Sequence, residues 1–227
     1  MKHSGKARKA AFKIVFWTLL VALALLASIV LATIIARHYV AIATAVSVAW
    51  VAFAAFTLYF FRDPNPTTPN IPSAIVSPAQ GKVDLMDETS EEEFLGGRCR
   101  RVSIFLSIID VHVQRAPITG QLAFSKHKEG RFLSATKSDC GEFNENVLLG
   151  FASSELPGRK LSVRLIAGLL ARRINVWAQT GETVHRGELI GLIQFGSRVH
   201  VYLPLDATVH VKLGDHVKVG ETLLGSF

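Results

Sequence analysis

A glycine followed directly by a serine interrupts a strand-like segment near the C-terminus, in LIGLIQFGSRVHVYLPLD. Most Gly-Ser pairs in strands mark a bulge or a close backbone approach and carry no chemistry. A serine in a strained turn can nevertheless attack the preceding carbonyl, because glycine has no Cβ and tolerates unusual backbone angles. Ser197 Oγ would then form an ester with Gly196, and loss of the Ser197 Cα proton would eliminate that ester to dehydroalanine. Dehydroalanine hydrolyses to a pyruvoyl group, so the pair predicts self-cleavage between Gly196 and Ser197.

A carboxylate and an imidazole lie two positions apart in SIIDVHVQR, where Asp110 precedes His112. Residues two apart on a strand share one face, so the pair predicts a base that activates the serine or removes its Cα proton. The alternative is a solvent-facing polar pair on an antiparallel strand. His200 is expected on the opposite face of a regular strand from Ser197. The other histidines considered are expected at the surface: His127, His185, His210 and His216.

Two adjacent cations, Arg172 and Arg173, follow an apolar stretch in IAGLLARRI. Guanidinium groups bind phosphate through paired hydrogen bonds. Neighbouring residues on a strand point to opposite sides, so we expect only one of the two to bind a substrate phosphate. A structural salt bridge is the alternative.

These candidates lie among short β-type runs that Gly, Pro and Asp turns separate, with few good helix windows. The runs are GKVDLM, RVSIFLS, VHVQRA, GQLAFSK, LSVRLIAG, INVWAQ, ELIGLIQF, RVHVYLP, TVHVKL and TLLGSF. The pattern predicts a β-dominated domain, all-β or α+β, over residues 74–227.

An internal repeat supports this class. TGETVHRGELIGLI, from Thr180 to Ile193, matches LGDHVKVGETLLGSF, from Leu213 to Phe227. Such turns are typical of biotinyl and lipoyl carriers and of other small barrel-sandwich folds, so the repeats predict that architecture. A carrier function is disfavoured, because no hairpin displays a Met-Lys or Asp-Lys pair and Lys212 lies in a strand-like position.

Two uncharged runs of 23 residues each, from Ile14 to Ala36 and from Tyr39 to Phe61, are long enough to cross a bilayer. A cleaved signal peptide fits poorly, because the first run is too long and a second follows at once. Only Arg37 and His38 separate the runs, so a hairpin over residues 14–61, spanning or re-entrant, is predicted. Five cations in residues 1–13 place both its ends in the cytoplasm by the positive-inside rule. The chain is therefore expected at the inner membrane of the cell, with its soluble domain cytoplasmic.

Residues 62–73 contain four prolines and predict an extended linker to the soluble domain. The formal net charge of +7, beside a membrane anchor, favours anionic lipid over nucleic acid as partner. Cys99 and Cys140 show no metal-ligand spacing and receive no function. No metal site is predicted.

The chain resembles the phosphatidylserine decarboxylase family in its short prokaryotic form, through six phrases in order: FFRDP, SPAQGKV, FLSIIDVHVQRAPITG, FNENV, IAGLLARRI and FGSRVHVYLP. The resemblance implies that Ser197 becomes the pyruvoyl cofactor of a small chain, 197–227, that stays with a membrane-bound large chain, 1–196. It also implies conversion of phosphatidylserine to phosphatidylethanolamine and CO2, through a Schiff base whose electrons the pyruvoyl group accepts. His112 gains support as a site residue from this match.

One residue departs from the family pattern. Members usually read Ser-Pro-Ala-Asp-Gly-Lys-Val, whereas this chain has Gln80 in place of that Asp. We expect a turn role for this position. Two other functions stay open: an unprocessed, membrane-anchored β-domain that binds lipid headgroups, and a pyruvoyl-dependent decarboxylase with a different, amino-acid-bearing substrate. A membrane anchor disfavours a soluble substrate.

Overall fold

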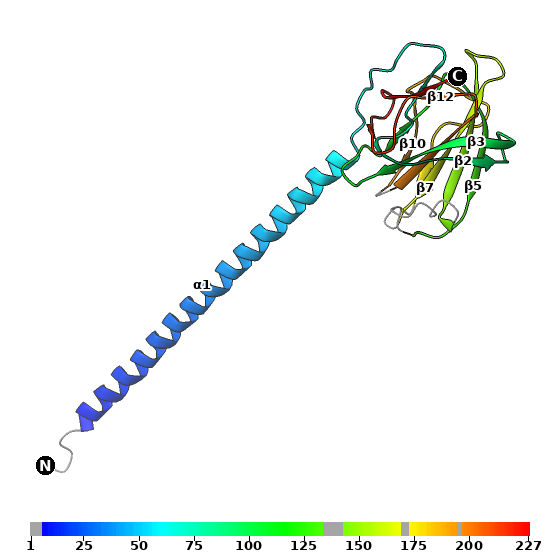
Figure 1. Cartoon of the computed structure of the whole chain (residues 1–227). Helices are drawn as coiled ribbons and strands as arrows, with labels where there is room; N and C mark the ends of the chain where they lie inside the picture. The colour runs from blue at the N-terminus through cyan, green and yellow to red at the C-terminus, as the bar shows by residue number, and fades with distance from the viewer. Residues whose placement is uncertain (1–5, 134–142, 169–172, 195–196) are drawn as a thin grey trace. The chain divides into compact units, whose positions relative to one another are not determined.

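The structure, a computed structural model, describes residues 6–133, 143–168, 173–194 and 197–227, with side chains from residue 12 onward. The chain forms two compact units, Met1–Phe56 and Thr57–Phe227. Figure 1 shows a long helix and a β-rich unit.

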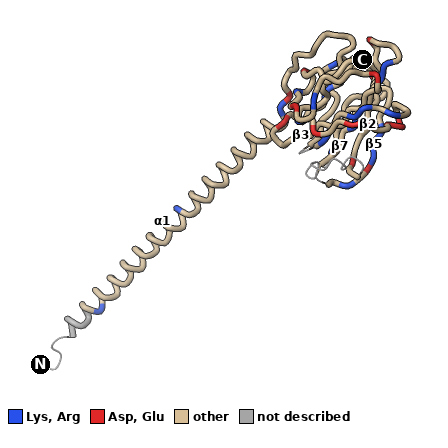
Figure 2. Tube along the Cα trace, in the orientation of Figure 1, with Lys and Arg blue, Asp and Glu red and all other residues tan. Residues whose placement is uncertain are grey.

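Helix α1 runs from Lys6 to Phe60 without interruption. The hairpin predicted over residues 14–61 stays a prediction for the chain in a bilayer. In the structure the helix is continuous through Arg37 and His38, and Nδ1 of His38 lies 2.8 Å from the carbonyl oxygen of Ile34 one turn earlier. The physical reason is composition, because residues 14–61 hold neither Gly nor Pro and are rich in good helix formers. Residues Phe12–Phe60 contain an 18-residue window with a mean hydropathy of 2.9 and are long and apolar enough to cross a membrane. Figure 2 shows how few charges the helix carries.

The β-rich unit confirms the predicted class. Its main sheet has eight strands in the order β13-β2-β3-β11-β7-β6-β5-β9. The bounds are β2 Gly81–Glu91, β3 Gly97–Leu106, β5 Gly120–Lys128, β6 Asn146–Ser153, β7 Lys160–Ala167, β9 Thr183–Val184, β11 Ser197–Leu203 and β13 His216–Val217. Neighbouring strands are antiparallel throughout. Strand β11 lies between β3 and β7, near the middle of the sheet.

Two small antiparallel sheets complete the unit. One has the order β1-β14-β12, with β1 Ala74–Val76, β12 Thr208–Val209 and β14 Leu223–Ser226. The other has the order β4-β10-β8, with β4 Val113–Arg115, β8 Ile174–Val176 and β10 Leu189–Ile193.

One apolar cluster joins the large sheet to both small sheets. It includes Val199 of β11, Leu165 of β7, Ile190 of β10 and Leu224 of β14, all fully buried. Each fully buried aliphatic side chain contributes about 1.5–3 kcal/mol relative to exposure. The core therefore fixes how the strands that carry the candidate residues lie against one another.

The internal repeat is a structural repeat as well. The amide of Gly181 donates to the carbonyl of Leu122, and the amide of Gly214 donates to the carbonyl of Val83, each at 2.8 Å. The later glycine of each copy, Gly187 or Gly220, has a φ near +75°, a left-handed turn conformation that favours glycine. The two copies therefore form equivalent turns. A segment that contains a proline holds each one: Ala116–Leu122 holds the first turn and Ser77–Val83 holds the second.

The Pro-rich segment 62–73 has no regular secondary structure apart from a turn, and it packs on the domain. Arg186, almost fully buried, donates to the carbonyls of Pro69 and Pro72 at 3.1 and 3.0 Å and pairs with Glu155. Pro66 lies so close to Gly220 that an added Cβ there would come within 2.9 Å of it. The segment is thus held against the domain at several points along its length.

Candidate active site

Ser197 is the first residue of β11 and pairs with Leu106 of β3 and Ala167 of β7. Its side chain is fully buried, and within the described part of the chain Oγ has no hydrogen-bond partner. Buried hydroxyls are nearly always hydrogen-bonded, because an unsatisfied one costs about 1–3 kcal/mol. The predicted nucleophile is therefore a buried hydroxyl to which no described residue donates and from which none accepts. Gly196, the other half of the predicted cleavage site, lies outside the described residues.

Two predicted residues flank the segment that leads into Ser197. The amide of Ile193 donates to the carbonyl of His112 at 3.2 Å. The amide of Gln194 donates to the carbonyl of Arg173 at 3.4 Å. The tertiary structure thus brings His112 and Arg173, which lie far away in the sequence, to Ile193 and Gln194, three and two residues before Gly196.

His112 is fully buried, and its ring packs against that of Phe60 with a centroid distance of 4.1 Å. Burial lowers the pKa of His112 below its usual value, and the contact with Asp110 opposes this shift only in part. Nδ1 lies 2.9 Å from the main-chain carbonyl of Asp110. A carbonyl can only accept, so Nδ1 carries the proton and Nε2 carries the lone pair. The imidazole is therefore neutral at pH 7 and suited to accept a proton.

Asp110 does not use its carboxylate as the sequence predicts. Residues 107–110 form a turn and not a strand, so Asp110 and His112 do not share a strand face. One carboxylate oxygen accepts from the amide and hydroxyl of Ser107, at 2.8 and 2.6 Å. The other lies 3.0 Å from Nε2 of His216. Asp110 thus shapes the turn through its carboxylate and orients His112 through its carbonyl.

The FFRDP phrase holds this turn from the other side. Arg62 donates to the carbonyl of Ile109 at 2.7 Å, and Asp63 forms an ion pair with Arg115. Phe60 covers His112, as described above. Sequence reasoning used the phrase only as a family marker and missed its role. Its position directly after the apolar run gave no sign of a partner 50 residues away.

The FNENV phrase supplies a second group that sequence reasoning missed. Asn144 is fully buried, and its amide donates to the carbonyl of Ala167 at 2.7 Å and to that of Leu133 at 2.9 Å. Ala167 is the residue opposite Ser197 on β7. Asn144 therefore fixes the strand end beside the candidate nucleophile.

The face of β11 opposite Ser197 is structural. Arg198 is fully buried and binds Asp84 through two hydrogen bonds, at 2.8 and 2.6 Å. His200, also buried, lies on this face with Nδ1 3.3 Å from the hydroxyl of Tyr202. The predicted orientation of His200 away from Ser197 is confirmed. The predicted surface positions are confirmed too for His127, His185, His210 and His216.

Arg172 lies outside the described residues, whereas Arg173 is exposed. An open groove of about 470 Å³ has Arg173 on its wall, beside the ion pair of His127 with Glu145. Among the described residues no carboxylate forms an ion pair with Arg173. The groove therefore offers a guanidinium that has no carboxylate partner among the described residues, beside the segment that leads to Ser197.

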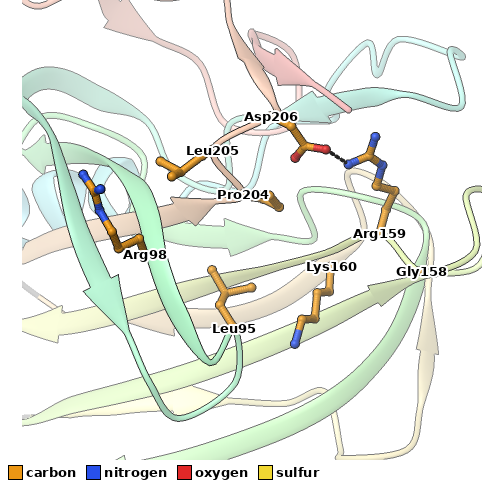
Figure 3. A pocket seen from close by; sticks show the side chains of 8 residues that line it. All are labelled: Leu95, Arg98, Gly158, Arg159, Lys160, Pro204, Leu205 and Asp206. Atoms are coloured by element: carbon orange, nitrogen blue, oxygen red, sulfur yellow. Dashed lines mark hydrogen bonds and ion pairs between the residues drawn. The ribbon is translucent and has the colours of Figure 1, made fainter.

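A second cavity, of about 390 Å³, lies at the far end of β11 (Figure 3). Its lining includes Arg159 and Lys160, but Arg159 is paired with Asp206 and Lys160 donates to the carbonyl of Phe94 at 2.8 Å. Pro204 on its wall is seven residues from Ser197, or about 23 Å along a strand. This cavity is separate from the candidate site.

Metal ligands do not gather at the site. Across the described ranges, no group of three His, Cys, Asp or Glu side chains is arranged to hold a metal ion.

The chain is similar to curated proteins over most of its length. The family model described as phosphatidylserine decarboxylase matches residues 53–225. A phosphatidylserine decarboxylase proenzyme of Desulfotalea psychrophila is 44% identical over 171 residues, 75% of this chain and 79% of that protein. One of Symbiobacterium thermophilum is 43% identical over 172 residues, 76% of this chain and 79% of that protein. The chain therefore belongs to the phosphatidylserine decarboxylase family.

Proposed function

We propose that the chain cleaves itself between Gly196 and Ser197 and then decarboxylates phosphatidylserine to phosphatidylethanolamine and CO2. The observation that carries this proposal is the buried Ser197 Oγ, which has no hydrogen-bond partner among the described residues. The similar proteins named proenzymes support a processing step.

In the proposed maturation, Ser197 Oγ attacks the carbonyl carbon of Gly196, so that a C–O ester bond forms and the C–N peptide bond breaks. A base then removes the Ser197 Cα proton, the Cα–H electron pair forms the Cα–Cβ double bond, and the Gly196 carboxylate leaves. Water adds to the resulting dehydroalanine and ammonia departs. His112, neutral and with its lone pair on Nε2, is the proposed base.

The pyruvoyl group so formed would supply an electron sink for decarboxylation. This chain's own residues bind the substrate and move protons. We assign Arg173 to the substrate phosphate, because its guanidinium forms no ion pair within the described ranges and lies on an open groove beside Gln194. His112 remains the group placed to hold or return a proton.

The two proposed chains, 1–196 and 197–227, would stay together as a heterodimer. After cleavage β11 belongs to the small chain yet lies between β3 and β7 of the large chain. The buried Arg198 and the partly exposed Asp84 then form an ion pair between the chains. Strand hydrogen bonds on both sides and this ion pair oppose release of the small chain.

We further propose that α1 attaches the protein to the inner membrane, with the β-rich unit in the cytoplasm. As a straight helix the 49 residues Phe12–Phe60 would be about 70 Å long, more than twice the hydrocarbon thickness. In a bilayer the segment must therefore bend, and two crossings would return the chain to the side of its cationic N-terminus. A protease added outside intact cells should leave the β-rich unit whole, and its digestion there would contradict this placement.

Gln80 favours a second candidate, an unprocessed lipid-binding domain. It stands where the family usually has an aspartate. The next residue, Gly81, pairs with Val217, which directly follows His216 in the chain. If that carboxylate is needed for maturation, this chain would remain uncleaved. We expect the turn to tolerate glutamine.

Intact-mass analysis of the purified, denatured protein separates the two candidates. The proposed enzyme gives a fragment of residues 197–227 that is lighter than the encoded peptide by one ammonia. Ser197→Ala should give one uncleaved chain with no decarboxylase activity, whereas Ser90→Ala, at an exposed site on β2, should be cleaved normally. An unbroken wild-type chain would exclude the enzyme and leave the lipid-binding domain.

A further inference from the structure

The turn between β3 and His112 ends in two exposed apolar side chains. Ile108 is 50% exposed and Ile109 is 63% exposed. Single exposed apolar residues are common, but adjacent ones at the tip of a turn beside a candidate site call for an explanation.

The turn is fixed to the end of the apolar helix. Arg62 donates to the carbonyl of Ile109 at 2.7 Å, and the hydroxyl of Tyr59 lies 3.4 Å from the same oxygen. The guanidinium of Arg62 also lies over the Tyr59 ring, 3.9 Å from its centroid. All these residues belong to the unit Thr57–Phe227, so their arrangement does not depend on the rest of the helix. The apolar segment Phe12–Phe60 ends within this cluster.

Tyr and Arg are typical of the membrane–water boundary, where the aromatic ring and the aliphatic stem meet lipid while the polar end meets water. If the apolar helix enters the bilayer at Phe60, then Tyr59 and Arg62 lie at that boundary. The turn that they hold must lie there as well. Its two isoleucines extend the exposed apolar surface of Phe61.

Two cations border this surface. Exposed Lys82 is the strand partner of His216, which lies 3.0 Å from the Asp110 carboxylate of the turn. Together with Arg62, Lys82 gives the turn a basic edge. Basic groups at the membrane surface attract anionic lipids. An apolar turn with a basic edge therefore fits a bilayer that contains anionic lipid better than it fits an apolar protein segment.

We infer that Ile108 and Ile109 form a second membrane contact, which inserts into an anionic bilayer and presents the turn bearing His112 to lipid headgroups. The inference rests on the proposed function for its catalytic consequence, though the insertion itself can be measured without turnover. Leu106, at the start of the same turn, is the strand partner of Ser197. Insertion of the turn would thus bring the nucleophile's strand to the membrane surface.

Fluorescence of the full chain in vesicles of phosphatidylglycerol and phosphatidylcholine tests the insertion. Ile109→Cys is labelled with an environment-sensitive dye in a Cys140→Ser background. Cys99 should not label, because burial raises the pKa of its thiol to about 11. Quenching by lipids spin-labelled near the headgroup should reduce the signal at least about twofold. Leu205→Cys, exposed at the far end of β11, is the matched control and should not be quenched. Equal or absent quenching at both positions would overturn the inference.

A kinetic comparison tests the consequence. The double variant Ile108→Ser, Ile109→Ser should lower the ratio of turnover on vesicle phosphatidylserine to turnover on a short-chain, dispersed phosphatidylserine by about tenfold. Leu205→Ser should leave this ratio unchanged. A ratio equal to that of the wild type would contradict the inference. If the wild type turns over neither substrate, the proposed function fails, while the quenching result still decides whether the turn inserts.

Discussion

The carboxylate of Asp110 lies 3.0 Å from Nε2 of His216, while the main-chain carbonyl of Asp110 lies 2.9 Å from Nδ1 of His112. One residue therefore orients the candidate base with its backbone and uses its side chain elsewhere. In the proposed mature protein, His216 would belong to the small chain and Asp110 to the large chain. The contact would then join the two chains beside the site.

Removal of the Asp110 carboxylate should disturb the turn more than removal of its histidine partner. Asp110→Ala leaves the partly buried amide and hydroxyl of Ser107 without their acceptor, so we expect a loss of about 1–3 kcal/mol in the free energy of unfolding. His216→Ala should cost less than about 1 kcal/mol, because the His216 side chain is 56% exposed. Urea unfolding in the uncleaved Ser197→Ala background, in detergent, measures both. Equal losses would show that the His216 contact holds the turn.

His112→Ala should slow self-cleavage or decarboxylation by about 10²–10⁴-fold, the usual effect of losing a general acid or base. Both steps must be followed, because a variant blocked in maturation cannot reveal a role in turnover. Since burial lowers the pKa of His112, the wild-type rate should fall only below about pH 6.5, as the imidazole becomes protonated. His210→Ala, at an exposed site, is the control. Normal cleavage together with normal CO2 release in His112→Ala would remove His112 from the site.

The Arg198–Asp84 pair should contribute strongly to stability. Arg198 is fully buried and the Asp84 side chain is 28% exposed, so Asp84→Ala would leave a buried cation without its carboxylate. We expect the free energy of unfolding to fall by about 3 kcal/mol. This is the lower end of the range for an ion pair that loses one partner and leaves a buried charge, because Ser103 still accepts a hydrogen bond from Arg198. Glu88→Ala breaks the exposed pair with Arg98 and should change stability by less than about 0.5 kcal/mol. Thermal unfolding of both variants measures the two losses of stability. Similar small shifts of the unfolding temperature in the two variants would mean that Asp84 contributes little to the stability of the fold.

His200 should make the protein less stable in mild acid. Burial, with the Arg101, Arg198 and Arg164 cations, holds the pKa of His200 well below its usual value. Below about pH 6.5 the unfolded chain gains a proton that the folded chain does not, so stability is fully present above that pH and falls as the pH falls. The slope is up to about 1.4 kcal/mol per pH unit for one proton.

His200→Gln should remove most of one proton from that slope between about pH 6.5 and pH 5. His112 has a lowered pKa for the same reason and should leave a residual slope. His185→Gln, at an exposed position, should keep the wild-type slope. Unfolding free energies measured across this pH range give the comparison. A His200→Gln slope equal to that of the wild type would show that His200 does not set it.

Local patterns in the sequence were enough for much of this protein. Turn residues and β-type runs predicted the β-dominated class. The sequence repeat of Thr180–Ile193 in Leu213–Phe227 forms two equivalent turns in the structure. The pair at Gly196 and Ser197 identified a candidate nucleophile. These predictions depend on backbone preferences and on residue spacing, which a short stretch of sequence contains in full.

The apolar segment shows where a local pattern and the described structure differ. The sequence predicts a hairpin at Arg37 and His38, whereas α1 is continuous through both residues. Residues 14–61 contain neither Gly nor Pro, the two residues that disfavour a helix most strongly. The hairpin stays a prediction for the chain in a bilayer.

Only the tertiary structure decided the partners of the candidate residues. The rule that residues two apart share a strand face put the Asp110 carboxylate beside His112, but a turn at 107–110 sends that carboxylate to Ser107 and His216. Phe60 on His112 and Asn144 on Ala167 join segments more than 20 residues apart. Such contacts follow from the order of strands, above all from the insertion of β11 between β3 and β7. Strand order depends on how the whole core packs, and no single stretch of sequence contains it.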